Sequence, residues 1–263
     1  MPLFKKIFNF SKQKDQPDNR RQAPRYPVRP SFPFKTSVTF LAHDDDGCAI
    51  PGDQVGRDWS GRLCNLSATG ASVQLHSTAV AIRDEPCMFK LSLDGYLLEI
   101  PGTVAHWRRH PQHVLCGIDF KFPDISTQSA FRQVLEPVSI GASLEPVNAK
   151  SVKQDSPGLF KEQFKNAGKS TLTLWRPQPK GEIHSFDFRL NDYGVSWGRG
   201  MAELKTYVVD HTAFADGKEE LHLEYHLTEA QKEAVRWLFC LAVPNLSESV
   251  PADVRNFLAE LVA

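Results

Sequence analysis

Hydrophobic and polar side chains alternate through most of residues 34–122, with the two-residue period of half-buried β-strands. The alternating stretches are rich in β-branched and aromatic residues and are separated by turn-forming residues such as Asp94-Gly95. They cover residues 34–42, 59–77 (with glycines at 61 and 70), 87–95, 96–109 and 113–122. The pattern predicts six antiparallel strands that form a small β-barrel.

A short helix is expected directly after these strands. Ser126 or Thr127 is its predicted N-cap, and Phe131 lies on the apolar face that would turn inward. We expect the helix to end before Pro137, because proline has no N–H to donate to the helical ladder. Residues 20–137 are thus predicted to form one domain, a β-barrel with a closing helix.

The second half of the chain has its own pattern. Residues 138–170 are rich in Ser, Pro, Gly, Asn and Lys, which predicts a linker. Five further strands are expected within 170–227, followed by helices over about 228–243 and 251–262, the first with a capping-box sequence. Residues 171–263 are therefore expected to be a β-rich α+β domain with C-terminal helices, which makes the whole chain mainly β. Strands followed by helices would also fit a diverged copy of the first domain. The role of residues 171–263 stays open between an output domain, a dimerisation surface and a partner-docking module.

Composition narrows the class of protein. The 263 residues carry 31 basic and 31 acidic side chains, and such a balance argues against a binder of nucleic-acid polymers. The five cysteines include no C-x-x-C pair, which is typical of a reducing compartment rather than of a disulfide framework. No run of about 18 apolar residues or secretory signal is present. We expect a soluble cytoplasmic protein.

Basic charge is concentrated at the N-terminus. Residues 1–35 carry nine basic and only two acidic side chains, which suggests an anionic partner. Residues 1–19 are predicted to be a basic, amphipathic tail, in which residues 2–10 (PLFKKIFNF) could make a weak contact with a membrane surface. Residues 20–30 (RRQAPRYPVRP) hold four arginines and three prolines, so they form a stiff, extended, cationic segment.

Two short motifs carry a resemblance to a known family. Residues 21–25 (RQAPR) fit R-x-x-x-R just ahead of the first predicted strand, and residues 65–70 (NLSATG) fit [D/N]-x-S-x-x-G in the next β-stretch. Residues 116–120 (CGIDF) are similar to the end of the family's last strand. In this order, on a small barrel with a closing helix, the chain resembles a PilZ domain, a bacterial receptor for cyclic di-GMP. The resemblance covers only the N-terminal half.

The resemblance implies a set of ligand-binding residues, and their chemistry suits cyclic di-GMP. The predicted residues are Arg21, Arg25, Asn65, Ser67 and Gly70. A guanidinium can grip the O6/N7 edge of guanine or two phosphate oxygens, and it can also stack on a base. An amide can read a guanine edge, a hydroxyl can bind a phosphate or base, and a glycine allows close backbone approach. The alternative for Asn65 and Ser67 is a turn cap that hydrogen-bonds its own backbone.

Two further arginines are secondary candidates. Arg20 could add a phosphate contact, and Arg108 could add charge near the end of a strand. We expect the arginine segment to be mobile in the free protein and to be held beside the barrel by the dinucleotide, which would signal to the second domain or to a protein partner bound there. The competing interpretation is a non-catalytic structural adaptor that binds a protein or a membrane surface without nucleotide.

Other chemistry is not indicated. The acidic stretch 43–47 (HDDDG) lacks the remaining ligands of a calcium loop, and His106, His110 and His113 are interpreted as surface histidines. No catalytic triad, phosphate-binding loop or dinucleotide fingerprint is present. We therefore expect neither an enzyme nor a resident cofactor or metal.

Overall fold

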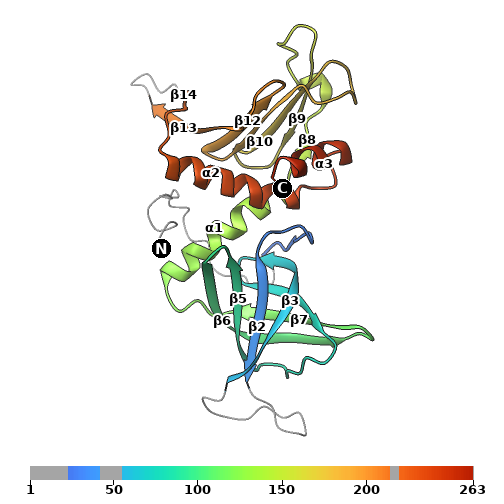
Figure 1. The fold of residues 1–263 in the computed structure, drawn as a ribbon, viewed down its shortest axis with the longest axis vertical. Coiled ribbons are helices and arrows are strands. Elements are labelled where there is room, and N and C mark those ends of the chain that lie inside the picture. Colours follow the sequence, from blue (N-terminus) through green and yellow to red (C-terminus); the bar gives the residue numbers. More distant parts are fainter. Residues whose placement is uncertain (1–22, 42–54, 214–218, 263) are drawn as a thin grey trace. The chain divides into compact units, whose positions relative to one another are not determined.

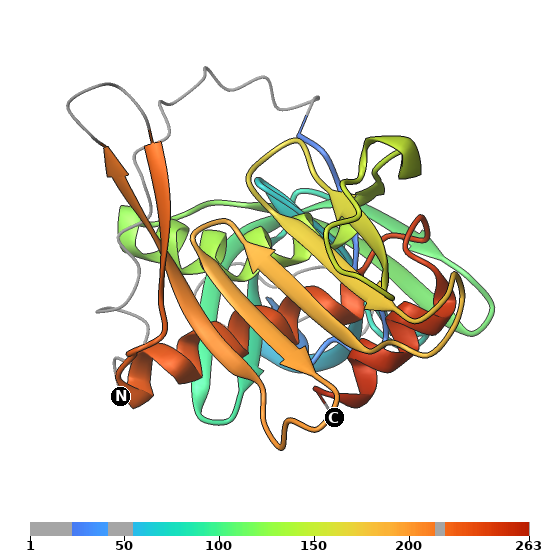
Figure 2. The ribbon, with the colours of Figure 1, turned by 90° about the horizontal axis from the view of Figure 1, so that it is seen from above.

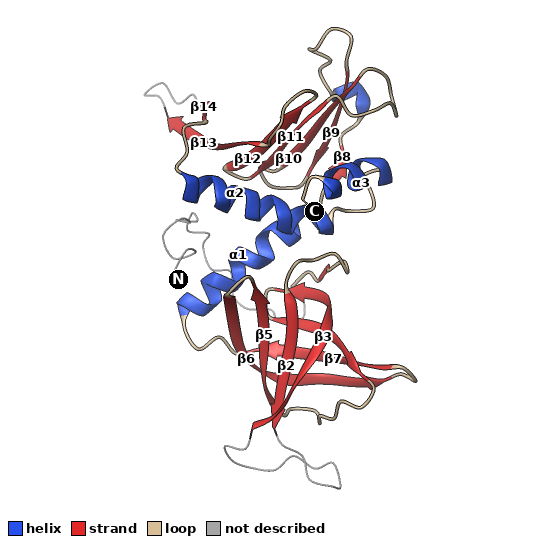
Figure 3. Cartoon of the chain, in the orientation of Figure 1, coloured by secondary structure: helices blue, strands red, loops and turns tan. Residues whose placement is uncertain are grey.

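The computed structural model of the chain describes residues 23–41, 55–213 and 219–262. The chain divides between Glu136 and Pro137 into two compact units. β-structure predominates in both, as Figure 3 shows, which confirms the predicted mainly-β class.

The first unit is a closed antiparallel β-barrel. Its strands are β1 (Tyr26–Pro27), β2 (Lys35–Leu41), β3 (Val55–Ser67), β4 (Gly70–His76), β5 (Pro86–Leu93), β6 (Tyr96–Arg109) and β7 (His113–Phe120). The strand order is β3-β2-β5-β6-β7-β4, and β4 pairs again with β3, so the ring closes (Figure 1). The two-residue strand β1 pairs with the last residues of β3, at Asn65 and Leu66. The prediction of six barrel strands is confirmed.

The barrel is filled by the inward-facing half of each alternating strand. On β5, for example, Phe89 and Leu91 are fully buried, while their polar neighbours Lys90 and Ser92 are not. Burying a large apolar side chain contributes roughly 1.5–3 kcal/mol, so this interior accounts for much of the stability of the unit. The other core residues include Val38, Phe40, Leu66, Val73, Leu75, Leu98, Ile100, Val104, Val114, Cys116 and Ile118.

Helix α1 (Ile125–Ala142) follows the barrel. Its Phe131 is fully buried, with its ring 5.0 Å from that of Phe120 and 5.6 Å from that of Phe122. The start differs from the prediction, because Asp124 caps the helix: its carboxylate accepts from the backbone N–H and the hydroxyl of Thr127.

The end of α1 also differs from the prediction, since the helix continues through Pro137 to Ala142. Proline removes one hydrogen bond, but the next turn is held by tertiary packing: Ile140 belongs to the core of the second unit. Gly141 is equally close-packed, because an added β-carbon would overlap the carbonyl oxygen of Ala242. Packing outweighs the local cost of the proline.

The second unit is an antiparallel sheet with helices on one face (Figures 1 and 2). Its strands run in simple chain order: β8 (Glu145–Pro146), β9 (Phe160–Lys165), β10 (Thr171–Arg176), β11 (Ser185–Leu190), β12 (Tyr193–Gly198), β13 (Lys205–Ala213) and β14 (Glu219–Glu224). This order differs from that of the barrel, where β4 crosses back to pair with β7. A short 3-10 helix, η1 (Ala149–Ser151), lies between β8 and β9.

Two C-terminal helices cover this sheet, as predicted. They are α2 (Glu229–Ala242) and α3 (Ala252–Glu260), with a 3-10 turn η2 (Val243–Asn245) between them. The capping box is present, because the Thr228 hydroxyl accepts from the Gln231 N–H and the Gln231 side chain accepts from the Thr228 N–H. The apolar faces of α2 and α3 pack with the strands in one core. Its residues include Phe164, Leu172, Leu174, Phe186, Phe188, Val195, Val235, Phe239, Val254 and Leu258.

The segment 138–170, predicted as a linker, contains regular structure. The last turns of α1 lie within it, and β8 and β9 are strands of the second sheet. Strand β9 (FKEQFK) escaped recognition because its two phenylalanines are also four residues apart, the spacing of a helix face. Pairing with β8 and β10 makes it a strand, with Phe164 buried in the core.

Candidate functional site

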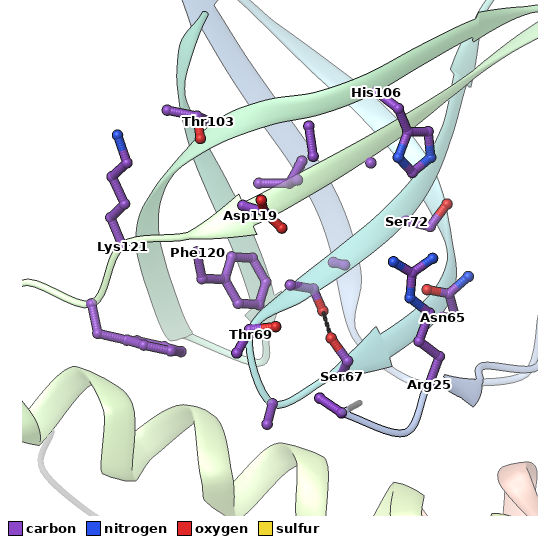
Figure 4. A pocket seen from close by; sticks show the side chains of 18 of the residues that line it. Arg25, Asn65, Ser67, Thr69, Ser72, Thr103, His106, Asp119, Phe120 and Lys121 are labelled. Atoms are coloured by element: carbon purple, nitrogen blue, oxygen red, sulfur yellow. Dashed lines mark hydrogen bonds between the residues drawn. The ribbon is translucent and has the colours of Figure 1, made fainter. Parts of the chain in front are cut away.

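A polar cavity of about 620 Å³ lies on the outer wall of the barrel. It covers the side-by-side strands β3, β4, β7 and β6, together with the segment just before β1 and the start of α1 (Figure 4). Its volume is within the range of small-molecule sites, roughly 300–1,000 Å³. Of the predicted binding residues, Arg25, Asn65, Ser67 and Gly70 line it.

The pairing of β1 with β3 brings the two motifs together. Tyr26 pairs with Leu66 and Pro27 with Asn65, so the same register continued by one residue places Arg25 opposite Ser67. Directly paired residues of antiparallel strands point to the same face. The residues of the arginine motif and of the strand motif therefore reach the cavity from adjacent backbones, as Figure 4 shows for Arg25, Asn65 and Ser67.

From Arg25 onward the arginine segment lies along the barrel, because β1 pairs with β3. Besides β1, the backbone N–H of Val28 donates to the carbonyl of Cys64 at 2.9 Å. Val28, Phe32 and Phe34 are also buried and act as apolar anchors. The backbone at Arg25 is thus held beside the barrel wall.

A β-bulge determines which side chains of β3 face the cavity. The pairing of β3 with β4 shifts between Leu63 and Asn65, so Cys64 is the extra residue. Before the bulge Leu63 is buried, and after it Leu66 is fully buried. Asn65 and Ser67 are therefore on the outer face. Within the residues that the structure describes, the Arg25 guanidinium donates no hydrogen bond and forms no ion pair, and the Asn65 amide makes no hydrogen bond.

Ser67 has a structural role in the turn that follows β3. Its side chain is buried, and its hydroxyl donates to the carbonyl oxygen of Gly70 at 3.2 Å. This is the turn-cap alternative weighed for this residue. Because the hydroxyl proton is used in the turn, Ser67 can offer a ligand only its oxygen lone pairs. It can accept from a donor such as a guanine N–H, and a phosphate contact would require the hydroxyl to turn.

Gly70 is required by close packing. An added β-carbon would overlap the carbonyl oxygen of Ile118 on β7. The turn is further fixed by the N–H of Phe120, which donates to the Thr69 carbonyl at 2.8 Å. The glycine thus allows β4 and β7 to approach and keeps this part of the cavity floor free of side chains.

Of the remaining predicted arginines, only Arg108 is among the residues that the structure describes, and it does not line the cavity. Arg20 and Arg21 lie outside the residues that the structure describes. Arg108 is exposed on β6, on the same outer face as His106 but one step farther along the strand. It pairs with Leu115, whereas His106 pairs with Gly117 at the cavity.

Sequence reasoning missed several polar residues of the site. Thr103 and His106 on β6, Asp119 on β7 and Lys121 just after it line the cavity with Arg25 (Figure 4). Thr103 pairs with Asp119, so both face outward. The cavity wall thus has two cations, Arg25 and Lys121, one carboxylate and one histidine, which suits a ligand with both anionic and hydrogen-bonding groups.

The described residues include no group of three or more His, Cys, Asp or Glu side chains that could bind a metal ion. The acidic stretch 43–47 lies outside them. None of the helices in the described ranges is long and apolar enough to cross a membrane.

The first unit matches a known protein family. Residues 19–136 match the PilZ domain family. Among solved structures, the chain is similar to the crystal structure of the "PilZ domain of CeSA from cellulose synthesizing bacterium", with 18% identity over 43% of this chain and 95% of that chain, and a TM-score of 0.28. No curated protein sequence matches the chain significantly.

Proposed function

Because residues 19–136 of this chain are a PilZ domain, we propose that the cavity on the barrel wall is a binding site for cyclic di-GMP and that the protein is a receptor for this second messenger. PilZ domains are a family of cyclic di-GMP receptors. The observation that carries the proposal for this chain is the β1–β3 register, which brings Arg25 of the first motif beside Asn65 and Ser67 of the second. The alternative is an adaptor that binds a protein or a membrane surface without nucleotide.

Each residue would have a distinct role. Arg25, with Arg21 four residues before it, would grip a phosphodiester or the O6/N7 edge of a guanine, since the guanidinium fork suits both. The Asn65 amide would read a base edge, and the Ser67 oxygen would accept from a base N–H. Gly70 would keep the floor open. Arg20 and Arg108 would add charge at the margins of the site.

Binding would be transmitted to the second unit, or to a protein partner bound there, through α1. Gln128 in the first turn of this helix lines the cavity, and Ile140 in its last turn belongs to the core of the second unit. A ligand that contacts the start of the helix could therefore influence how its end packs.

The test is calorimetric titration of the full chain with cyclic di-GMP, with GTP as the control ligand. Charge-assisted hydrogen bonds contribute about 1.5–3 kcal/mol each, so Arg25→Ala should weaken binding by roughly tenfold or more. Hydrogen bonds between the neutral Asn65 amide and a base contribute about 0.5–1.5 kcal/mol, so Asn65→Ala should weaken binding by roughly two- to tenfold. Arg57→Ala is the matched control, because Arg57 lies on β3 over the Trp59 ring, away from the cavity. Wild-type protein that binds neither ligand, or Arg25→Ala that binds like the wild type, would contradict the proposal and favour the adaptor.

A further inference from the structure

One titratable side chain of the cavity has no part in the proposed clamp. His106 lies on β6 directly after a second β-bulge, where the pairing with β7 shifts between Val104 and His106. The bulge turns His106 to the outer face opposite Gly117. Its imidazole lies over Gly117 so closely that a β-carbon there would overlap the ring. Because Gly117 has no side chain, the His106 imidazole can lie directly on its backbone at the edge of the cavity.

The position of His106 completes a row across the cavity. In successive pairings Asn65 on β3 lies opposite Ser72 on β4, Ser72 opposite Gly117 on β7, and Gly117 opposite His106 on β6. The middle of this row is low, because Ser72 is small and buried and Gly117 has no side chain. Three strand spacings separate the ends by about 14 Å at most. Asn65 and Arg25 form one wall of a shallow trough, and His106 forms the other.

The surroundings of His106 disfavour the protonated imidazolium. Burial lowers the pKa of His106, and the positive charges of Arg25 and Arg108 lower it further, while the Asp119 carboxylate partly opposes them. Lys121 is a further cation of the cavity wall. An anion placed between Arg25 and His106 would reverse this balance, because it would screen the arginine and favour the imidazolium.

We propose that His106 is a further ligand-contacting residue of this cavity, which becomes protonated when the dinucleotide binds and donates to one of its phosphodiesters. The inference rests on the proposed function. The proton comes from the solvent, so binding and proton uptake are coupled. Affinity should therefore rise as the pH falls, by at most about tenfold per pH unit, between the pKa values of the bound and the free imidazole.

The test is calorimetric titration of the full chain with cyclic di-GMP at pH 6, 7 and 8, in buffers of different ionisation enthalpy. The wild type should take up a fraction of one proton per ligand at pH 7 and should bind more tightly at pH 6 than at pH 8. His106→Gln, which keeps a neutral donor, should bind at pH 8 within a few-fold of the wild type. It should lose both the proton uptake and the pH dependence.

The matched control is His113→Gln, because the His113 ring stacks on His110 at 4.6 Å and does not line the cavity. It should keep the proton uptake of the wild type. If His106→Gln does not fold, NMR titration of the wild-type imidazoles provides the same test, since ligand should raise the pKa of His106. Wild-type binding without proton uptake, or uptake that persists in His106→Gln, would overturn this inference and leave the proposed function intact. Wild-type protein that binds at no pH would contradict the proposed function itself.

Discussion

Gly70 lies against the carbonyl group of Ile118, where β4 pairs with β7 beside the cavity. A side chain at position 70 would overlap that carbonyl oxygen, which belongs to the backbone and cannot move alone. The glycine of the N-x-S-x-x-G motif is therefore a packing requirement of the barrel as well as part of the site.

Gly70→Ala should accordingly destabilise the protein. Overpacking of this kind costs typically about 1–3 kcal/mol, since β4 must move away from β7. Thermal or chemical unfolding measures the loss, and cyclic di-GMP affinity should fall with it. Gly198→Ala is the control, because its β-carbon would meet the Met201 sulfur at an ordinary 3.5 Å. Equal stability of Gly70→Ala and the wild type would show that the strand pair tolerates a β-carbon.

Arg25→Lys separates charge from shape in the proposed site. Lysine keeps the positive charge but lacks the planar fork that binds guanine O6/N7 or two phosphate oxygens at once. We expect a loss of roughly tenfold in cyclic di-GMP affinity, measured by calorimetry. Arg57→Lys, outside the cavity, should bind like the wild type. Arg25→Lys with full affinity would mean that Arg25 acts only as a point charge.

The barrel could be predicted from the sequence because each of its strands has one face in the core and one in solvent. Apolar and polar side chains must therefore alternate along the strand. Phe89 and Leu91 on β5 illustrate this pattern. Two other features could not be predicted. Strand β1 has only two residues, one of them proline, and α1 passes Pro137 because its last turn is packed in the second core. Contacts distant in sequence determine both.

The site was predictable only in part, for the same reason. The two motifs identified Arg25, Asn65 and Ser67, although the register that joins them was not visible in the sequence. His106 was predicted to lie on the surface but not in the site, because the register that places β6 in one row with Asn65 of β3 was not visible in the sequence. Thr103 faces out, yet three residues later His106 also faces out, and Trp107 turns inward, 5.6 Å from Phe40. The β-bulge allows both Thr103 and His106 to face outward, because strict alternation from Thr103 would turn His106 toward the core.

Buried Tyr207 and partly buried Asp187 form a hydrogen-bonded pair on the second sheet, which predicts a pH-dependent stability effect. The Tyr207 hydroxyl is 2.8 Å from both carboxylate oxygens of Asp187, and the tyrosine ring covers Gly194. Burial raises the pKa of Asp187, while the Tyr207 hydrogen bond and the charge of Arg189 lower it. Because the folded pKa is raised, the contribution of Asp187 to stability falls as the pH rises from the unfolded value, about 3.9, through the folded one.

Tyr207→Phe should therefore destabilise the protein more at pH 7 than at pH 4. Without the hydroxyl the pKa of Asp187 rises further, and at neutral pH a partly buried carboxylate loses its donor, which costs about 1.5–3 kcal/mol. Urea unfolding at the two pH values measures the difference. Tyr225→Phe is the control, since Tyr225 is half exposed and should have little effect at either pH. An equal loss at both pH values would contradict the assigned role of the carboxylate.

Arg176 joins β10 to β9 and to α3. Its guanidinium, only 2% exposed, donates to Glu162 at 2.9 Å, to the Gly181 carbonyl at 2.6 Å and to Asp253 at 2.7 Å. Arg176→Met fills the space but removes all three bonds. Since both carboxylates reach solvent and can be hydrated, we expect a loss of about 1.5–3 kcal/mol at pH 7, below the cost of breaking a fully buried pair.

The loss in Arg176→Met should become smaller in acid. Burial alone would raise the pKa of Asp253, but the hydrogen bond and charge of Arg176 outweigh it and lower that pKa. A carboxyl with a lowered folded pKa contributes stability above its unfolded pKa, about 3.9, and that contribution is lost as the pH falls through the folded value. Urea unfolding of the wild type and Arg176→Met at pH 7 and pH 3 should therefore show the two stabilities converging. Arg199→Met removes an exposed ion pair to Glu182 at 3.7 Å and should change stability little at either pH. A constant difference between wild type and Arg176→Met would show that Arg176 acts through packing alone.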